Sequence, residues 1–211
     1  MKSVTSPVIA PVIAPVIAPV QGEGYVPRSA ISPGVTTYIE DTFTEASPPV
    51  DILAHTMDVG PGWTAFDSEF YRCIAGGKIE QQFGVDGGIY ADAGVSDCVV
   101  RFTADQVAWG VLIRVSDRAH WFRAAIQSAT QISIQKNDDG VITAPGITTG
   151  LSLTFPAPIK VTCAGDSITM EIEGQEGSIE VTESFNNTAT SFGLRTNGEG
   201  LTGDSFSVKS E

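Results

Sequence analysis

Two carboxylates in the C-terminal part of the chain come nearest to a catalytic pair. Glu171 and Glu173 alternate within residues 168–173, and residues two apart on a strand share one face. A glycosidase needs two carboxylates, about 5–9 Å apart, that flank the bond it cleaves. A solvated row of acids on the outside of a strand shows the same spacing, and we expect this second arrangement.

No other motif in the sequence points to catalysis. His55 and His120 have no serine or cysteine partner at the spacing of a known nucleophilic enzyme. We expect His55 to hydrogen-bond the backbone of its own loop. The sequence has no phosphate-binding loop, no dinucleotide-binding fingerprint and no cluster with metal-ligand spacing. We therefore predict that the chain is not an enzyme and that it uses no cofactor.

A set of arginines with one tryptophan is the stronger candidate for a functional surface. A two-residue turn at 117–118 would place Arg114 opposite Trp121, where a guanidinium can stack on the indole ring. Trp and Arg are favoured anchors of binding surfaces, which indicates a recognition face for a carbohydrate, an acidic ligand or a partner subunit. Arginine stems that cover a ring on a solvated face would give the same pattern, so both interpretations stay open. The predicted face consists of Arg101, Arg114, Trp121, Arg123 and Gln135.

The elements that position these side chains are short segments of alternating polarity. Four of them follow one another within residues 96–137, which predicts an antiparallel meander of four strands. Residues 144–154 are typical of an irregular loop. About a dozen strands and no convincing helix predict an all-β protein, a two-sheet antiparallel jelly-roll sandwich. The apolar side of the meander, which a second sheet must cover, is predicted to carry Cys98, Val100, Phe102, Trp109, Val111, Ile113, Val115, Phe122, Ala124, Ile126, Ile132 and Ile134.

Charge and cysteine content restrict the partners and the compartment. The formal net charge is −13, so the chain repels nucleic-acid backbones and anionic membranes, and we expect neither as a partner. Cys73, Cys98 and Cys163 form an odd set without metal spacing. This set predicts free buried thiols and assembly in a reducing cytoplasm. The sequence shows no transmembrane span and no signal peptide, because proline interrupts the apolar N-terminal segment.

The N-terminal segment has its own repeat. Residues 7–18 are three copies of Pro-Val-Ile-Ala, and proline at this period excludes a helix interior or a central strand. We predict an extended, Pro-rich arm and hinge over residues 1–36 and one globular domain over residues 37–211. Exposed Val and Ile favour an arm anchored on another protein over a disordered linker, which is typically polar. The predicted anchoring residues are Pro7, Val8, Ile9, Pro11, Val12, Ile13, Pro15, Val16, Ile17 and Pro19.

Several segments resemble concanavalin A-like (laminin-G-like) jelly-roll domains. They are the Asp-Thr-Phe opening at 41–43, the strands at 109–117 and 120–127, the hairpin at 163–174, and the closing segments 191–196 and 204–208. The opening, with Asp41, Phe43, His55 and Trp63, is similar to one common in tailed-bacteriophage virion proteins. Catalytic members of this fold often carry Glu-x-Asp-x-x-Glu on one strand, and the chain has no such run. The fold hosts lectins, glycosidases and structural modules, so the resemblance says more about fold than about function.

Calcium is the one ion that the sequence leaves open. The turn at 137–140 supplies carboxylate oxygens, although an Asn-Asp-Asp-Gly turn needs no ion. Asp41 and Asp204 open matching triplets on terminal strands that the resembled fold places side by side. Paired strand starts with Phe43 and Phe206 in the core also explain these triplets, and we favour that explanation over a metal site. The weak calcium candidates are Asp41, Asp204, Asp138 and Asp139.

Two functions follow as hypotheses. The first is a non-enzymatic surface protein of a phage virion (a capsid decoration protein, head fibre or tail adhesin) that assembles in the host cytoplasm. Its arm would bind capsid or tail proteins, and the domain would be a homo-oligomer. The second is a carbohydrate-binding module that recognises host surface glycans through the arginine and tryptophan face. A glycoside hydrolase is the least favoured alternative.

Overall fold

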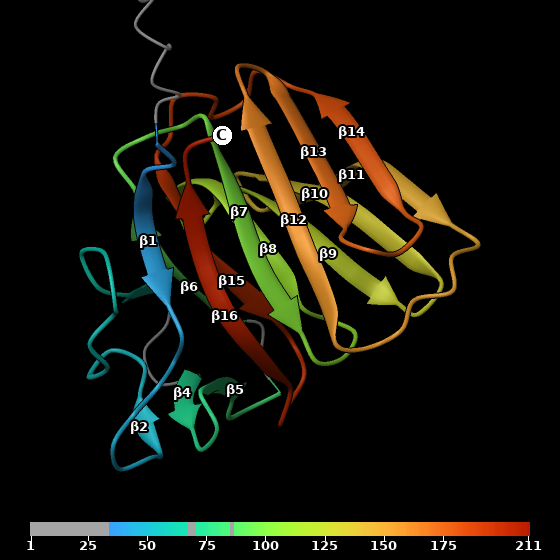
Figure 1. Cartoon of the computed structure of the whole chain (residues 1–211). Helices are drawn as coiled ribbons and strands as arrows, with labels where there is room; N and C mark the ends of the chain where they lie inside the picture. Colours follow the sequence, from blue (N-terminus) through green and yellow to red (C-terminus); the bar gives the residue numbers. More distant parts are fainter. Residues whose placement is uncertain (1–33, 67–70, 85–86) are drawn as a thin grey trace, which may run out of the picture. The chain divides into compact units, whose positions relative to one another are not determined.

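The structure, a computed structural model, describes residues 34–66, 71–84 and 87–211. The chain divides into two units, residues 1–34 and residues 35–211. The anchoring residues predicted between positions 7 and 19 lie outside the described residues. The second unit is an all-β sandwich of two antiparallel sheets, as the sequence predicted (Figure 1).

Nine strands form one sheet. Its order is β14-β13-β12-β7-β16-β5-β4-β2, and β1 also pairs with β16. The strands are β1 (Thr37–Asp41), β2 (Val50–Asp51), β4 (Tyr71–Ile74), β5 (Lys78–Gln81), β7 (Cys98–Ala104), β12 (Ala157–Ala164), β13 (Ser167–Ile172), β14 (Ser178–Thr182) and β16 (Thr202–Lys209).

The second sheet has seven strands in the order β11-β10-β9-β8-β15-β6-β3. The strands are β3 (Thr64–Ala65), β6 (Gly87–Asp92), β8 (Gly110–Asp117), β9 (His120–Ser128), β10 (Gln131–Asp138), β11 (Val141–Thr149) and β15 (Ser191–Thr196). The inner faces of both sheets contribute to one apolar core. All of the side chains predicted for the apolar side lie in this core, with Val115 as the exception.

The predicted four-strand meander is wrong in one respect. Strands β8, β9 and β10 form a meander, but β7 belongs to the nine-stranded sheet, where it pairs with β12 and β16. Residues 105–109 carry the chain from one sheet to the other. Alternation could not distinguish the two sheets, because the apolar sides of both face the shared core.

Strand β11 occupies residues 144–149 of the irregular loop predicted over residues 144–154, and residues 150–154 belong to no strand. It pairs with β10 along one edge of the seven-stranded sheet, and nearly all of its residues are exposed. Because both sides of the strand are in contact with solvent, its sequence carries no alternation. Pro145 is tolerated because an edge strand has one side without a ladder partner.

The three cysteines are free and buried, as predicted. Cys98 and Cys163 lie directly opposite one another on β7 and β12. A hydrogen bond with Cys163, together with burial, raises the pKa of the Cys98 thiol, which therefore stays protonated. Across the described residues, no helix combines the length and apolar character needed to cross a bilayer.

Candidate functional site

The outer face of the seven-stranded sheet carries a second, smaller apolar cluster. Leu112, Val115 and Trp121 are buried there, and Phe66 and Tyr90 pack against them while remaining partly exposed. We call Phe66, Tyr90, Leu112, Trp121 and Arg195 the aromatic face. It lies on β6, β8, β9 and β15, with Phe66 directly after β3.

Trp121 forms the base of the aromatic face. Its side chain points away from the main core, as the alternation predicted, yet only 1% of it is exposed. The indole Nε1 donates a hydrogen bond to the carbonyl of Arg118 at 2.8 Å. The guanidinium of Arg195 lies 4.5 Å from the centre of the indole, which is cation–π distance. The Arg118 carbonyl therefore fixes the edge of the indole, and the Arg195 guanidinium covers its face.

Phe66 and Tyr90 form the exposed part of the aromatic face. Their ring centres are 5.1 Å apart at an interplanar angle of 37°. A side chain at Gly88 would come within 2.7 Å of the Phe66 ring, so glycine at this position lets the ring lie against the sheet. In the described part of the chain the Tyr90 hydroxyl has no hydrogen-bond partner. Two partly exposed rings and one open hydroxyl can receive the apolar face of a sugar ring and one of its hydroxyl groups.

The predicted pair of Arg114 and Trp121 is wrong. Strand β8 has a bulge between Ile113 and Asp117, and Arg114 has a φ of 53°. The last residue pair before the turn is Asp117 and His120, whereas a turn at 117–118 would have paired Ser116 with Ala119. Beyond the bulge the strand faces are exchanged, so Val115 joins the outer cluster. The Arg114 side chain is instead buried and donates to the carbonyls of Gly165 and Glu183.

The other members of the predicted face are divided between the two sheets. Arg123 and Gln135 are register partners on β9 and β10, and Leu112 lies opposite Arg123 as predicted. Arg123 is only 7% exposed, crosses over Gly110 and donates from Nη2 to the carbonyl of Ala108 at 2.7 Å. Arg101 lies on β7 in the other sheet. The structure thus brings together Trp121, Arg123 and Gln135, but neither Arg101 nor Arg114.

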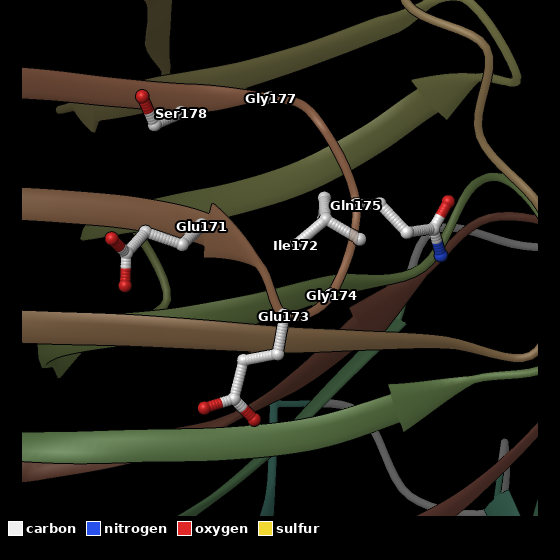
Figure 2. A pocket seen from close by; sticks show the side chains of 7 residues that line it. All are labelled: Glu171, Ile172, Glu173, Gly174, Gln175, Gly177 and Ser178. Atoms are coloured by element: carbon white, nitrogen blue, oxygen red, sulfur yellow. The ribbon is translucent and has the colours of Figure 1, made fainter.

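The two acids Glu171 and Glu173 lie on the outside of the nine-stranded sheet, in the row that the sequence predicted. Each forms an ion pair, Glu171 with Lys160 at 2.9 Å and Glu173 with Arg101 at 3.1 Å. They border an open hollow of about 470 Å³ at the β13–β14 turn, and the two carboxylates do not converge on a common point (Figure 2).

A buried polar cluster occupies the loop that follows β1. The Asp41 carboxylate accepts hydrogen bonds from the Trp63 indole (2.6 Å), the Phe43 backbone amide (2.7 Å) and His55 Nε2 (2.8 Å). His55 Nδ1 contacts Glu45 at 2.5 Å. His55 therefore bonds two carboxylates and not the backbone, contrary to our prediction. Burial lowers the pKa of His55, but the hydrogen bonds to Glu45 and Asp41 outweigh this effect and hold it above its usual value.

The calcium candidates are distributed over three places. The terminal strands β1 and β16 do pair, with Phe43 and Phe206 in the core, as predicted. The oxygens of Asp41 are occupied by N–H donors, and such donors repel a cation. Asp138 ends β10, and Asp139 lies in the turn that follows. Within residues 34–66, 71–84 and 87–211, no group of three or more acidic, histidine or cysteine side chains is arranged to hold a metal ion.

Neither a protein-family model nor a curated protein sequence matches the chain. Among solved structures, the chain is similar to the carbohydrate-binding module CBM66 from Bacillus subtilis, with 14% identity and a TM-score of 0.51 over 71% of this chain and 95% of that one. Domain 4 of AbnA, a GH43 extracellular arabinanase from Geobacillus stearothermophilus in complex with arabinotriose, has 13% identity and a TM-score of 0.54 over 83% and 93%. The GH16 endo-beta-1,3(4)-glucanase SCLam has 11% identity and a TM-score of 0.52 over 85% and 92%.

At such identities the similarity establishes the fold and not the activity. None of the three structures named is a virion protein, so the virion assignment stays a prediction. The chain has a concanavalin A-like jelly-roll β-sandwich fold, resembling carbohydrate-binding modules and domains of GH16 and GH43 proteins.

Proposed function

We propose that the domain is a carbohydrate-binding module without hydrolytic activity and that it binds glycans on the aromatic face. One observation carries the proposal: the partly exposed Phe66 and Tyr90 rings, packed on a buried base, on the outer face of a sandwich that resembles carbohydrate-binding modules. Aromatic rings provide a flat apolar contact, and the tyrosine hydroxyl adds a polar group at its margin.

The base beneath these rings supports the same function. Trp121 is fixed by its hydrogen bond to the Arg118 carbonyl and by Arg195 on its face. Leu112 is fully buried below. A contact surface that is already ordered loses less conformational entropy when a ligand binds, so Phe66 and Tyr90 can bind a weakly interacting sugar at a low cost.

The acid pair supports binding without hydrolysis. Glu171 and Glu173 lie on the sheet opposite the aromatic face, and each is paired with a cation. A glycosidase needs one carboxylic acid and one carboxylate that face the same glycosidic bond. These two side chains therefore support a structural role on the sheet surface.

The charge of the chain favours neutral glycans. With a formal net charge of −13, the domain repels polyanions at long range. We expect neutral polysaccharides and host surface glycans to bind in preference to sulfated or uronic-acid polymers.

A glycan array with the full chain, followed by titration of the strongest neutral glycan, tests the proposal. Tyr90→Ala should weaken binding about 30-fold, the effect of removing an anchor residue worth about 2 kcal/mol. Tyr38→Ala is the matched control, because Tyr38 is also a partly exposed strand tyrosine but lies on β1 of the other sheet. Equal weakening by both variants, or no binding of any glycan by the native chain, would contradict the proposal.

The virion role rests on the sequence alone. The N-terminal repeats and the opening around Asp41 motivate it, and a virion adhesin that binds host glycans would combine both hypotheses. Incorporation of the chain into particles through residues 1–36 is therefore a separate proposal.

A further inference from the structure

A groove on the outer face of the nine-stranded sheet is separate from the aromatic face. It crosses β1, β16, β7 and β12, which lie side by side (Figure 1). Its volume is about 210 Å³, which is below the range of about 300–1,000 Å³ that is typical of pockets for drug-sized ligands. The groove therefore fits a small ligand.

Two rows of polar side chains line the groove. Arg101, Ser207 and Glu40 are register partners across β7, β16 and β1 and form the first row. Thr103 and Ser205 form the second, where a bulge in β16 inserts Ser205 with a φ of 42°. The rings of Phe102 and Phe206 point into the core on the other side of the sheet. Strand backbone therefore forms the floor of the groove, and Pro158 of β12 adds an apolar edge beside the polar side chains.

The walls hold hydrogen-bonding groups that remain unused within the described residues. Arg101 donates from Nε to Glu173 at 3.1 Å, and its two terminal amino groups have no protein acceptor there. The hydroxyls of Thr103, Ser205 and Ser207 likewise have no partner in the described part of the chain. Unused donors and acceptors therefore lie side by side on the two paired strands β7 and β16.

The charges of the groove select the class of ligand. Glu40 is paired with Lys209 at 2.8 Å, and Glu173 with Arg101. These paired charges, in a chain of net charge −13, give no surplus of positive charge for an anion. Since the Phe102 and Phe206 rings are buried below the groove, no aromatic side chain among its described lining residues is open to stacking. Hydrogen bonds to the ligand's own hydroxyl groups would then supply most of the specificity.

We propose that this groove is a second binding site, which takes a single neutral sugar ring. The inference does not depend on glycan binding by the aromatic face, because the two sites share no residue and lie on different sheets. Hydroxyl groups of the ring would accept from the Arg101 amino groups and exchange hydrogen bonds with Thr103, Ser205 and Ser207.

Amide chemical-shift mapping of the full chain tests the proposal. The ligands are glucose, galactose, mannose, xylose and arabinose, with glucuronate as the anionic comparison. We expect at least one neutral sugar to shift the amide resonances of Thr103, Ser205 and Ser207. Thr103→Val should lower the affinity for that sugar roughly fivefold, the effect of one net hydrogen bond. Thr162→Val is the matched control, since Thr162 is also partly exposed and lies on β12 outside the groove.

Three outcomes would overturn the proposal. They are no shift of the groove amides by any neutral sugar, a shift by glucuronate alone, and equal weakening by Thr103→Val and Thr162→Val. Tyr90→Ala should leave the groove shifts unchanged. A failure of the aromatic face to bind glycans is thereby distinguished from a failure of this site.

Discussion

Replacing Asp41 with alanine should destabilise the domain more than any other single loss of a carboxylate. Asp41 is fully buried and accepts hydrogen bonds from Trp63, Phe43 and His55. Among the described residues, removal leaves a buried imidazolium with Glu45 as its one remaining carboxylate contact. It also leaves an indole N–H and an amide N–H without the acceptor that they had.

The expected magnitude follows from these contacts. Removing one partner of a buried ion pair costs about 3–5 kcal/mol. Each buried donor that loses its acceptor costs about 1–3 kcal/mol on its own, but the three losses share one carboxylate and do not add. We therefore expect Asp41→Ala to lower the free energy of unfolding by about 3–5 kcal/mol near pH 6.

Urea unfolding, followed by tryptophan fluorescence, measures this effect. The control is Asp58→Ala, because Asp58 accepts two hydrogen bonds from Thr42 at 2.8 Å in the same loop but at the exposed surface. We expect about 1 kcal/mol for the control. A loss below about 1 kcal/mol for Asp41→Ala, or equal losses for the two variants, would refute the role of Asp41 as the centre of the loop.

Four further predictions concern other parts of the chain. The pKa of His55 is raised in the folded state, so protonation of His55 should stabilise the domain fully below about pH 6.5 and progressively less as pH rises through the folded pKa. The free energy of unfolding of His55→Gln, measured between pH 6 and 9, should lack this decline. Trp121→Ala should cost about 3–5 kcal/mol in thermal or urea unfolding, and a mild effect would show that its ring is not buried. Changing Glu171 and Glu173 to glutamine should lower the free energy of unfolding by less than about 1 kcal/mol per ion pair. The double variant and the native chain should show the same result in assays of polysaccharide hydrolysis. Deleting residues 1–24 should leave a cooperatively folding domain that is not incorporated into virions, and normal incorporation would refute the anchor.

Alternation was sufficient to predict the fold class and most of the core. It placed Trp121 and Phe122 on opposite faces and placed Phe102 and Ile113 inward, as the structure shows. Period-two patterns report which side of a strand faces the core, and two sheets that share one core satisfy the same patterns. For that reason the pattern could not assign β7 to its sheet.

The remaining errors have local and non-local causes. Arg114 departs from its predicted face because a bulge in β8 exchanges the two faces, and its partners Gly165 and Glu183 are more than fifty residues away. His55 binds Asp41 from fourteen positions along the chain, a pairing that no periodicity reveals.

A signal for the aromatic face was present in the sequence. Tyr90 directly follows the core residue Ile89 in β6, and Arg195 directly follows the core residue Leu194 in β15. Because neighbouring residues of a strand face opposite sides, both could be identified as outward-facing. Their convergence with Trp121 depends on the strand order β9-β8-β15-β6, which alternation alone does not give.

Amide and indole chemical-shift mapping with the best neutral glycan tests the proposed function most directly. We predict that the largest shifts occur at Phe66, Tyr90 and the Trp121 indole N–H, and that Tyr90→Ala removes them while Tyr38→Ala does not. Shifts confined to other parts of the domain, or shifts that persist in Tyr90→Ala, would contradict glycan binding by the aromatic face.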